Sequence, residues 1–200
     1  MKLQKIIPTL SVIFVLSSCA AGYKTINPNS LNYQSTSMDK GVTVDYKYGL
    51  LSSRYAKKET NNKIRLVAIK VTNNSGKDLI FGKNIKLTFT NNNEIALMDE
   101  NQTYSELKQG WAGYLFYLLL TPATLNVNSN GTQSSTPIGY VLGPGLAAGN
   151  IIAASSANNN FKDELTKYDI SGSVIKNGDS VYGLVGFKSD TFDAIKVRVD

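Results

Sequence analysis

The stretch Lys63-Ile-Arg-Leu-Val-Ala-Ile-Lys-Val-Thr72 decides the fold. Its apolar residues fall on both faces of an extended chain and many are β-branched, as is typical of a strand at the centre of a sheet. A run of turn-forming residues, Asn-Asn-Ser-Gly-Lys-Asp at 73–78, follows directly. The sequence therefore predicts a central strand that ends in a tight turn.

Shorter strands are predicted on both sides of this one, because apolar and polar residues alternate there with a period of two. The apolar sets are Val42, Val44, Tyr46 and Tyr48; Ile85, Leu87 and Phe89; Val181, Val185 and Phe187; and Ile195, Val197 and Val199. Asn177-Gly178 comes before the third set and is a strong hairpin signal, since both residues tolerate positive φ. Short strands separated by turns favour a mainly β fold, an antiparallel β-sandwich.

The composition limits the chemistry that the chain can perform. Of the 200 residues, 42% are hydrophobic, which suits one folded domain with appendages. There is no histidine and only one cysteine, so Ser-His-Asp and Cys-His catalytic groups and the usual zinc sites are excluded. Adjacent acids occur at Asp99-Glu100 and Asp163-Glu164, but no local motif marks either pair as catalytic. We expect no enzyme activity, no catalytic residue, no metal and no cofactor.

The first 18 residues predict a secretory signal that is removed from the mature protein. A short basic segment, Met1 to Lys5, precedes the apolar stretch from Ile6 to Leu16. A membrane-spanning helix needs about 20 apolar residues, so this stretch is too short to be one. It ends in Leu16-Ser17-Ser18-Cys19.

This ending resembles the lipobox of bacterial lipoprotein precursors. The resemblance implies a diacylglyceryl group on the sulfur of Cys19, cleavage just before it, and a further fatty acyl chain, such as palmitate, on the new amine. Two or more acyl chains hold a protein stably on a membrane. The resemblance also implies a cell-envelope lipoprotein, and Ala20 in place of an aspartate favours the outer membrane. The partners we expect are the membrane and other envelope proteins, and not nucleic acid.

The segment after the lipid attachment site predicts a tether. Residues 19–40 are rich in polar and small side chains and lead to the domain predicted at 41–200. Residues 40–86 carry eleven lysines and arginines against three acids. These bases have two open interpretations: an ordinary solvated face, which their spacing favours, or attraction to anionic head groups.

Two segments of the predicted domain resemble immunoglobulin-like modules of bacterial envelope lipoproteins. Residues 177–187 are similar to the penultimate hairpin of such modules, and residues 67–78 to their central strand and turn. The resemblance implies an immunoglobulin-like β-sandwich that binds partners or acts as a spacer, without an active site.

Residues 111–155 break the β pattern. Residues 111–120 are almost wholly apolar, and residues 138–154 are rich in glycine and alanine. The second stretch contains two G-x-x-x-G spacings, Gly139/Gly143 and Gly145/Gly149, which give a helix a smooth face that another backbone can approach. The sequence predicts an apolar helical hairpin inserted into the sandwich. An amphipathic helix at 160–170 follows, with Phe161, Leu165 and Tyr168 on one face.

Two interpretations of the hairpin stay open. It packs on the sandwich as a second small core, or it forms a surface that enters lipid or drives self-association. An apolar surface of this size is a liability in water, so something must cover it. The residues predicted for a membrane or self-association face are Trp111, Tyr114, Phe116, Gly139, Gly143, Gly145 and Gly149.

Overall fold

The structure, a computed structural model, describes residues 20–129 and 132–200. The chain divides into two compact units. The hairpin unit consists of described residues 20–22 and 109–158, and the sheet unit consists of 23–108 and 159–200. Helix α4 (Gly139–Lys167) contributes to both. The predicted insertion at 111–155 lies entirely in the hairpin unit, whereas Cys19 and the predicted signal lie outside the described residues.

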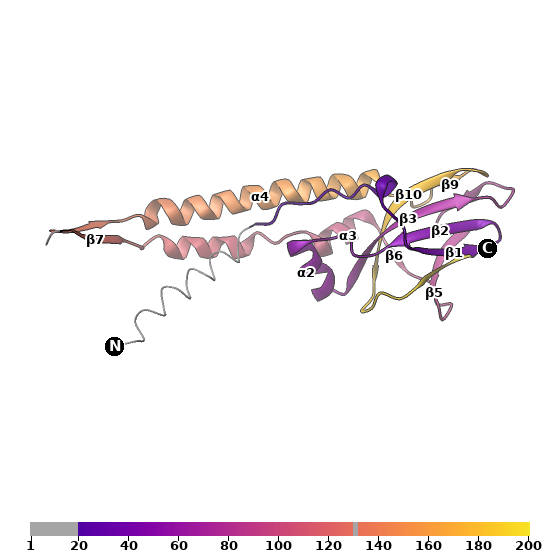
Figure 1. The fold of residues 1–200 in the computed structure, drawn as a ribbon, viewed down its shortest axis with the longest axis horizontal. Helices are drawn as coiled ribbons and strands as arrows, with labels where there is room; N and C mark the ends of the chain where they lie inside the picture. Colours follow the sequence, from indigo (N-terminus) through magenta and orange to yellow (C-terminus); the bar gives the residue numbers. More distant parts are fainter. Residues whose placement is uncertain (1–19, 130–131) are drawn as a thin grey trace. The chain divides into compact units, whose positions relative to one another are not determined.

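The sheet unit is built on a five-stranded antiparallel sheet with the strand order β1-β2-β3-β10-β6 (Figure 1). Its strands are β1 (Ser35–Asp39), β2 (Val42–Lys47), β3 (Ile64–Asn73), β10 (Ser180–Lys188) and β6 (Leu97–Met98). Strand β3 pairs with β2 on one side and with β10 on the other, so that Ile69 lies opposite both Tyr46 and Gly183. The central strand predicted from residues 63–72 is therefore confirmed.

Strand β3 separates two apolar cores, which explains why both of its faces are apolar. Val67, Ile69 and Val71 belong to one buried cluster, and Leu66 and Ala68 belong to another. Successive side chains of a strand point to opposite faces, so each core receives every second residue.

Two strands cover the first core. Strands β5 (Ile85–Phe89) and β11 (Ile195–Val199) form an antiparallel pair, and Leu87 and Val197 are buried in this core. Side chains of β1 bind the backbone of β11: Ser37 Oγ accepts from the Val197 amide at 3.0 Å, and Asp39 Oδ2 accepts from the Val199 amide at 2.8 Å. The short strands β4 (Leu79–Ile80) and β9 (Val174–Ile175) form a further antiparallel pair.

Helices cover the second core. It contains Tyr55 from α2 (Ser53–Asn61), Leu107 from α3 (Glu100–Leu107), and three residues from the end of α4 or just beyond it. Those three are Phe161, Leu165 and Tyr168, so the predicted apolar face of this helix is confirmed.

The expected mainly β sandwich is corrected to a mixed fold. Helix accounts for 33% and strand for 31% of the structure. The antiparallel sheet is present, but an immunoglobulin-like sandwich is not confirmed, because helices rather than strands cover the second core. Helix α3 begins at Glu100 because Asp99 caps it: Asp99 Oδ1 accepts from the Gln102 amide at 2.7 Å.

The segment predicted as a tether contains ordered structure. It includes the 3₁₀-helix η1 (Pro28–Ser30) and strand β1. Ile26 is buried, and its amide donates to Glu164 Oε2 at 2.8 Å. The Tyr23 hydroxyl donates to the same carboxylate oxygen, and burial beside this carboxylate raises the pKa of Tyr23. One buried acid on α4 therefore fixes the start of the sheet unit.

Candidate functional site

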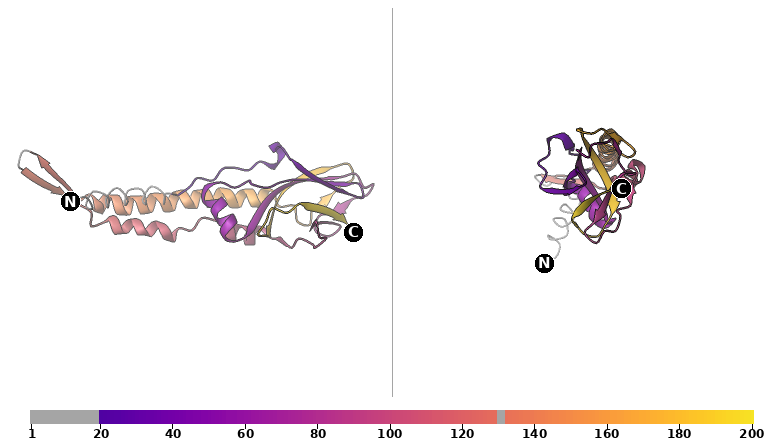
Figure 2. Two further views of the ribbon diagram at one scale, coloured as in Figure 1. Left: turned by 60° about the horizontal axis from the view of Figure 1, so that its bottom comes forward. Right: turned by 90° about the vertical axis from the view of Figure 1, so that its right-hand side faces the viewer.

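The hairpin unit contains two helical arms and a strand pair. The arms are η2 (Ala112–Leu120) and residues 139–158 of α4, and they run side by side in Figures 1 and 2. Between them in the chain come β7 (Leu125–Ser129) and β8 (Thr132–Thr136), which pair antiparallel. The amide of Gly139 donates to the Ala123 carbonyl at 2.9 Å and joins the two arms where α4 begins. Among the described helices, none combines the length and the apolar character needed to cross a membrane.

Two glycines allow the arms to approach closely. A Cβ atom added to Gly139 would meet the backbone oxygens of Leu120 and Thr121. A Cβ atom added to Gly143 would lie 2.9 Å from Thr121 Oγ1 and 3.0 Å from the Tyr117 carbonyl oxygen. Gly139 and Gly143 of the first G-x-x-x-G spacing therefore lie where α4 contacts η2 and the residues that follow η2.

The structure divides the residues predicted for an exposed face into two groups. Tyr114, Gly139 and Gly143 are buried within the unit, so they do not belong to its surface. Trp111, Phe116, Gly145 and Gly149 are exposed, and a Cβ atom added to either of these two glycines would meet nothing within 4 Å. Two glycine pairs with the same spacing thus have different environments.

The core of the hairpin unit is small. Its buried members are Tyr114, Tyr117, Ala147 and Ala154, and Ala20, Leu120 and Ile151 pack against them. Alanine has little apolar surface to bury, so most of the large apolar side chains of this unit remain outside.

Polar side chains fasten the segment after Cys19 to this unit. The buried Gln109 side chain accepts from the Ala21 amide at 3.2 Å through Oε1 and donates to the Ala21 carbonyl at 2.6 Å through Nε2. The backbone amide of Gln109 donates to Asn158 Oδ1 at 2.8 Å, and Asn158 Nδ2 donates back to the Gln109 carbonyl at 3.0 Å. The Ala20 amide donates to Asn150 Oδ1 at 2.5 Å. The residue after the predicted lipid attachment site therefore lies on α4.

Sequence reasoning missed Gln109, Asn150 and Asn158. Each is an amide side chain in or beside an apolar stretch, which is the only local signal that they make hydrogen bonds within the unit.

The surface of the hairpin unit is unusually apolar. Of the fifteen exposed large hydrophobic residues among those described, twelve belong to it. They are Trp111, Leu115, Phe116, Leu118, Leu119, Leu125, Val127, Tyr140, Val141, Leu142, Leu146 and Ile152.

The same part of the chain has no charge. No aspartate, glutamate, lysine or arginine occurs from residue 109 to residue 161. Surfaces that face water are normally rich in charged side chains of both signs. A surface that combines many exposed apolar side chains with no charge suits an apolar environment rather than water.

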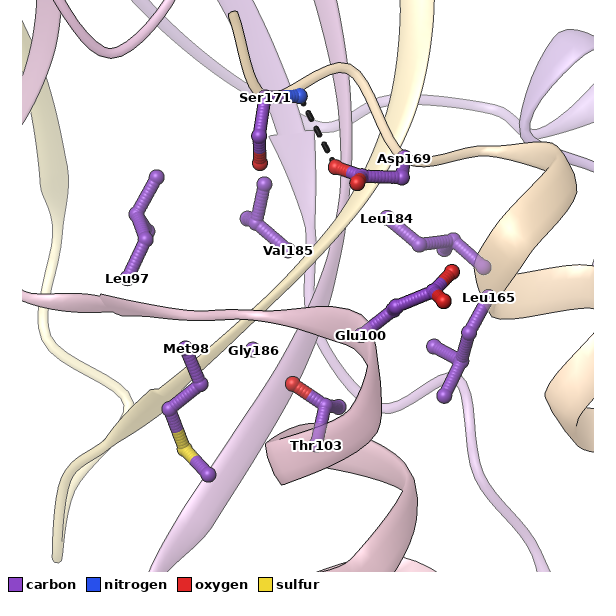
Figure 3. A pocket seen from close by; sticks show the side chains of 10 residues that line it. All are labelled: Leu97, Met98, Glu100, Thr103, Leu165, Asp169, Ser171, Leu184, Val185 and Gly186. Carbon is purple, nitrogen blue, oxygen red and sulfur yellow. Dashed lines mark hydrogen bonds between the residues drawn. The ribbon is translucent and has the colours of Figure 1, made fainter.

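The sheet unit contains two hollows that are alternative candidate sites. The first is lined by Glu100, Thr103, Leu165, Asp169 and Gly186 among others (Figure 3). Its volume of about 10 Å³ holds about one water molecule. Asp169 Oδ1 already accepts from the Ser171 amide at 2.9 Å. This hollow is too small for a substrate.

The second hollow, of about 150 Å³, lies beside Lys86 and Glu94. Lys86 Nζ lies 3.3 Å from carboxylate oxygens of both Glu94 and Asp200, and Arg198 Nη2 lies 2.7 Å from Glu94. The hydrogen bonds to these acids raise the pKa of Lys86, and those from the two bases lower the pKa of Glu94. The four charges neutralise one another, as in an ordinary surface ion-pair network.

The predicted acid pairs do not converge on a reaction centre. Asp99 caps α3 and Glu100 lines the small hollow, whereas Glu164 is buried against Tyr23 and Ile26. In residues 20–129 and 132–200, no group of three or more acids and cysteines is placed to hold a metal ion.

The exposed face of the hairpin unit is therefore the most distinctive surface of the chain. The chain matches no protein-family model, no curated protein and no solved structure.

Proposed function

We propose that this chain is a non-enzymatic lipoprotein of the cell envelope whose hairpin unit enters lipid beside its own acyl anchor on Cys19. The observation that carries the proposal is the exposed apolar, uncharged surface of the hairpin unit. This choice develops the second of the two interpretations drawn from residues 111–155.

Energetics favour lipid as the environment of this surface. Burying one large apolar side chain contributes about 1.5–3 kcal/mol relative to leaving it in water. Phe116, Leu119 and Val141 are each more than 70% exposed, so each can still gain most of that energy. An uncharged segment avoids the large cost of placing a charge in a bilayer. Trp111 and Tyr140, both exposed, belong to the residue types that gather at membrane surfaces.

The predicted anchor is joined to the hairpin unit through one residue. Cys19 directly precedes Ala20, whose amide is hydrogen bonded to Asn150 on α4. Once the acyl chains are in the membrane, the contact of the hairpin unit with lipid is effectively intramolecular. Even a weak affinity of the hairpin unit for lipid is then enough to keep it bound. The acyl chains and the hairpin unit therefore anchor the protein to the membrane together.

The sheet unit stays outside the apolar interior of the membrane in this proposal. Its charged residues and its two cores suit a binding or spacer module, the role that the resemblance to immunoglobulin-like modules implies. The outer membrane is the location that we propose, on the basis of Ala20.

Vesicle flotation of residues 20–200 tests the proposal without the acyl chains. We expect the unacylated chain to float with phosphatidylcholine vesicles, and a Phe116→Ser, Leu119→Ser, Val141→Ser variant to stay in the aqueous fraction. Met38→Ser with Val174→Ser is the matched control, because these are exposed apolar residues of the sheet unit. Unchanged flotation of the triple variant would contradict the proposal. So would a parent chain that forms oligomers through these side chains and ignores vesicles.

Mass spectrometry of the mature protein tests the anchor. We expect an N-terminal Cys19 that carries acyl chains, and an unmodified thiol would contradict this part.

A further inference from the structure

The chain crosses between the two units at three places. At each of them, the nearest charged residue is a lysine of the sheet unit. The chain passes between the units after residue 22, after residue 108 and after residue 158. The first charged residues on the sheet-unit side are Lys24, Lys108 and Lys162. All three side chains are exposed.

Two of these lysines lie against the same aromatic ring. Lys108 Nζ is 5.2 Å from the centre of the Tyr104 ring, and Lys162 Nζ is 5.7 Å from it. The attraction between a cation and the face of a ring holds each ammonium group there. Neither lysine forms an ion pair with any described residue. Two like charges on one ring without an acidic partner form a site that attracts an anion.

Aromatic contacts also bring Tyr23, which follows the crossing after residue 22, into the cluster around Tyr104. The Tyr104 and Phe161 rings are 6.3 Å apart, and the Tyr23 and Phe161 rings are 5.2 Å apart. Lys24 follows Tyr23 directly in the chain.

The acids near this cluster are mostly occupied. Glu164 accepts from Tyr23 and Ile26 in the interior. Glu106 Oε2 accepts from Asn62 Nδ2 at 3.0 Å. Asp163 is exposed and follows Lys162 directly in the chain, but it forms no ion pair with Lys108 or Lys162. The ammonium groups of Lys108 and Lys162 are therefore not neutralised by direct contact with any described acid.

We propose that Lys108 and Lys162, held on Tyr104, bind the phosphate groups of anionic lipids. The inference rests on the proposed function, because the uncharged chain next to these lysines is the part that would lie in lipid. Lysine side chains can keep their charge at the head groups while their stems lie along apolar surface. A base near an anionic membrane adds about fivefold in affinity, so two bases add about thirty-fold.

Trp111 provides the readout, because it is the only tryptophan and it is exposed in the hairpin unit. Residues 20–200 are titrated with vesicles of phosphatidylcholine alone and with an equal mixture of phosphatidylcholine and phosphatidylglycerol. We expect tryptophan emission to move to shorter wavelength with both, and binding to be tighter with the anionic vesicles. A Lys108→Gln, Lys162→Gln variant should bind anionic vesicles about thirty-fold more weakly and neutral vesicles as the parent does.

Lys77→Gln with Lys83→Gln is the matched control, because it removes the same charge from two exposed lysines that do not contact Tyr104. A loss in this control as large as in the Lys108/Lys162 variant would overturn the inference, since net charge would then explain the effect. Equal binding of the parent to both kinds of vesicle would overturn it too, while the proposed function would stand. Failure of the parent to bind any vesicle would overturn both.

Inorganic phosphate distinguishes a lipid head group from a free anion. We expect phosphate to compete with anionic vesicles no better than chloride does at equal ionic strength. Displacement by phosphate alone would assign the lysines to a free anion and contradict the assignment to lipid.

Discussion

The hairpin unit and the sheet unit differ in how many of their large apolar side chains they bury. The sheet unit buries isoleucine, valine, leucine and phenylalanine in two cores on the two faces of β3, and exposes three large apolar residues. The hairpin unit buries mainly tyrosine and alanine and exposes twelve. This difference in exposure is the observation on which the proposed entry of the hairpin unit into lipid rests.

The largest difference should appear when a phenylalanine is truncated in each unit. Phe161→Ala removes a fully buried ring from the helix-covered core and should cost about 3–5 kcal/mol of unfolding free energy. Phe116→Ala removes an exposed ring and should change stability in water by less than about 0.5 kcal/mol. Urea denaturation of both variants measures this. A large loss for Phe116→Ala would mean that the hairpin is packed rather than exposed.

A second comparison uses the two glycine pairs of the hairpin unit. Gly139→Ala places a methyl group against the backbone of residues 120 and 121 and should destabilise the hairpin by about 1–3 kcal/mol. Gly149→Ala lies in open space inside a helix and should stabilise it by about 0.5–1 kcal/mol. Hydrogen exchange of α4 amides reports both changes. Equal effects of the two substitutions would contradict the close approach of η2 to Gly139.

A smaller effect is expected from Asn150→Ala, which removes the acceptor of the Ala20 amide. The loss of one hydrogen bond should cost about 0.5–1.5 kcal/mol. The amides of residues 20 and 21 should exchange faster, while those of β3 should keep their protection. Unchanged exchange at Ala20 would show that the segment after Cys19 is not held on α4.

The smallest effect concerns pH, and it should be confined to the sheet unit. The salt bridges from Lys86 and Arg198 lower the pKa values of Glu94 and Asp200. These carboxylates therefore stabilise the fold above their unfolded pKa values of about 4. That stabilisation is lost as the pH falls through their lower folded pKa values. Arg198→Gln should reduce this dependence in acid denaturation curves.

The hairpin unit has no acidic or basic side chain, so its binding to neutral vesicles should be the same at pH 5 and pH 7. A strong pH dependence of the Trp111 signal on such vesicles would contradict this contrast.

The sequence was sufficient to predict the strands of the sheet but not what covers them. An alternating pattern such as Ile85, Leu87 and Phe89 shows that a strand has one apolar face, and this was confirmed. The same pattern contains no information on whether a strand or a helix lies against that face. Helix α2 escaped prediction because it is short and polar, with only Tyr55 and Glu59 buried.

The candidate surface was predictable as a region but not residue by residue. The lack of β pattern at 111–155 indicated a separate element, and the hairpin unit contains it. Which glycines approach a neighbour depends on where η2 lies, and identical spacings cannot show this. Tyr114 and Phe116 look alike in the sequence, yet one is buried and the other is 73% exposed.

Quenching of Trp111 in the acylated protein, reconstituted in vesicles, tests the central claim most directly. A quencher attached to the lipid acyl chains should reduce the emission of this tryptophan strongly, and aqueous iodide should have little effect. If iodide quenches Trp111 as it does in the unacylated chain without vesicles, and the lipid-bound quencher does not, then the hairpin unit does not enter lipid.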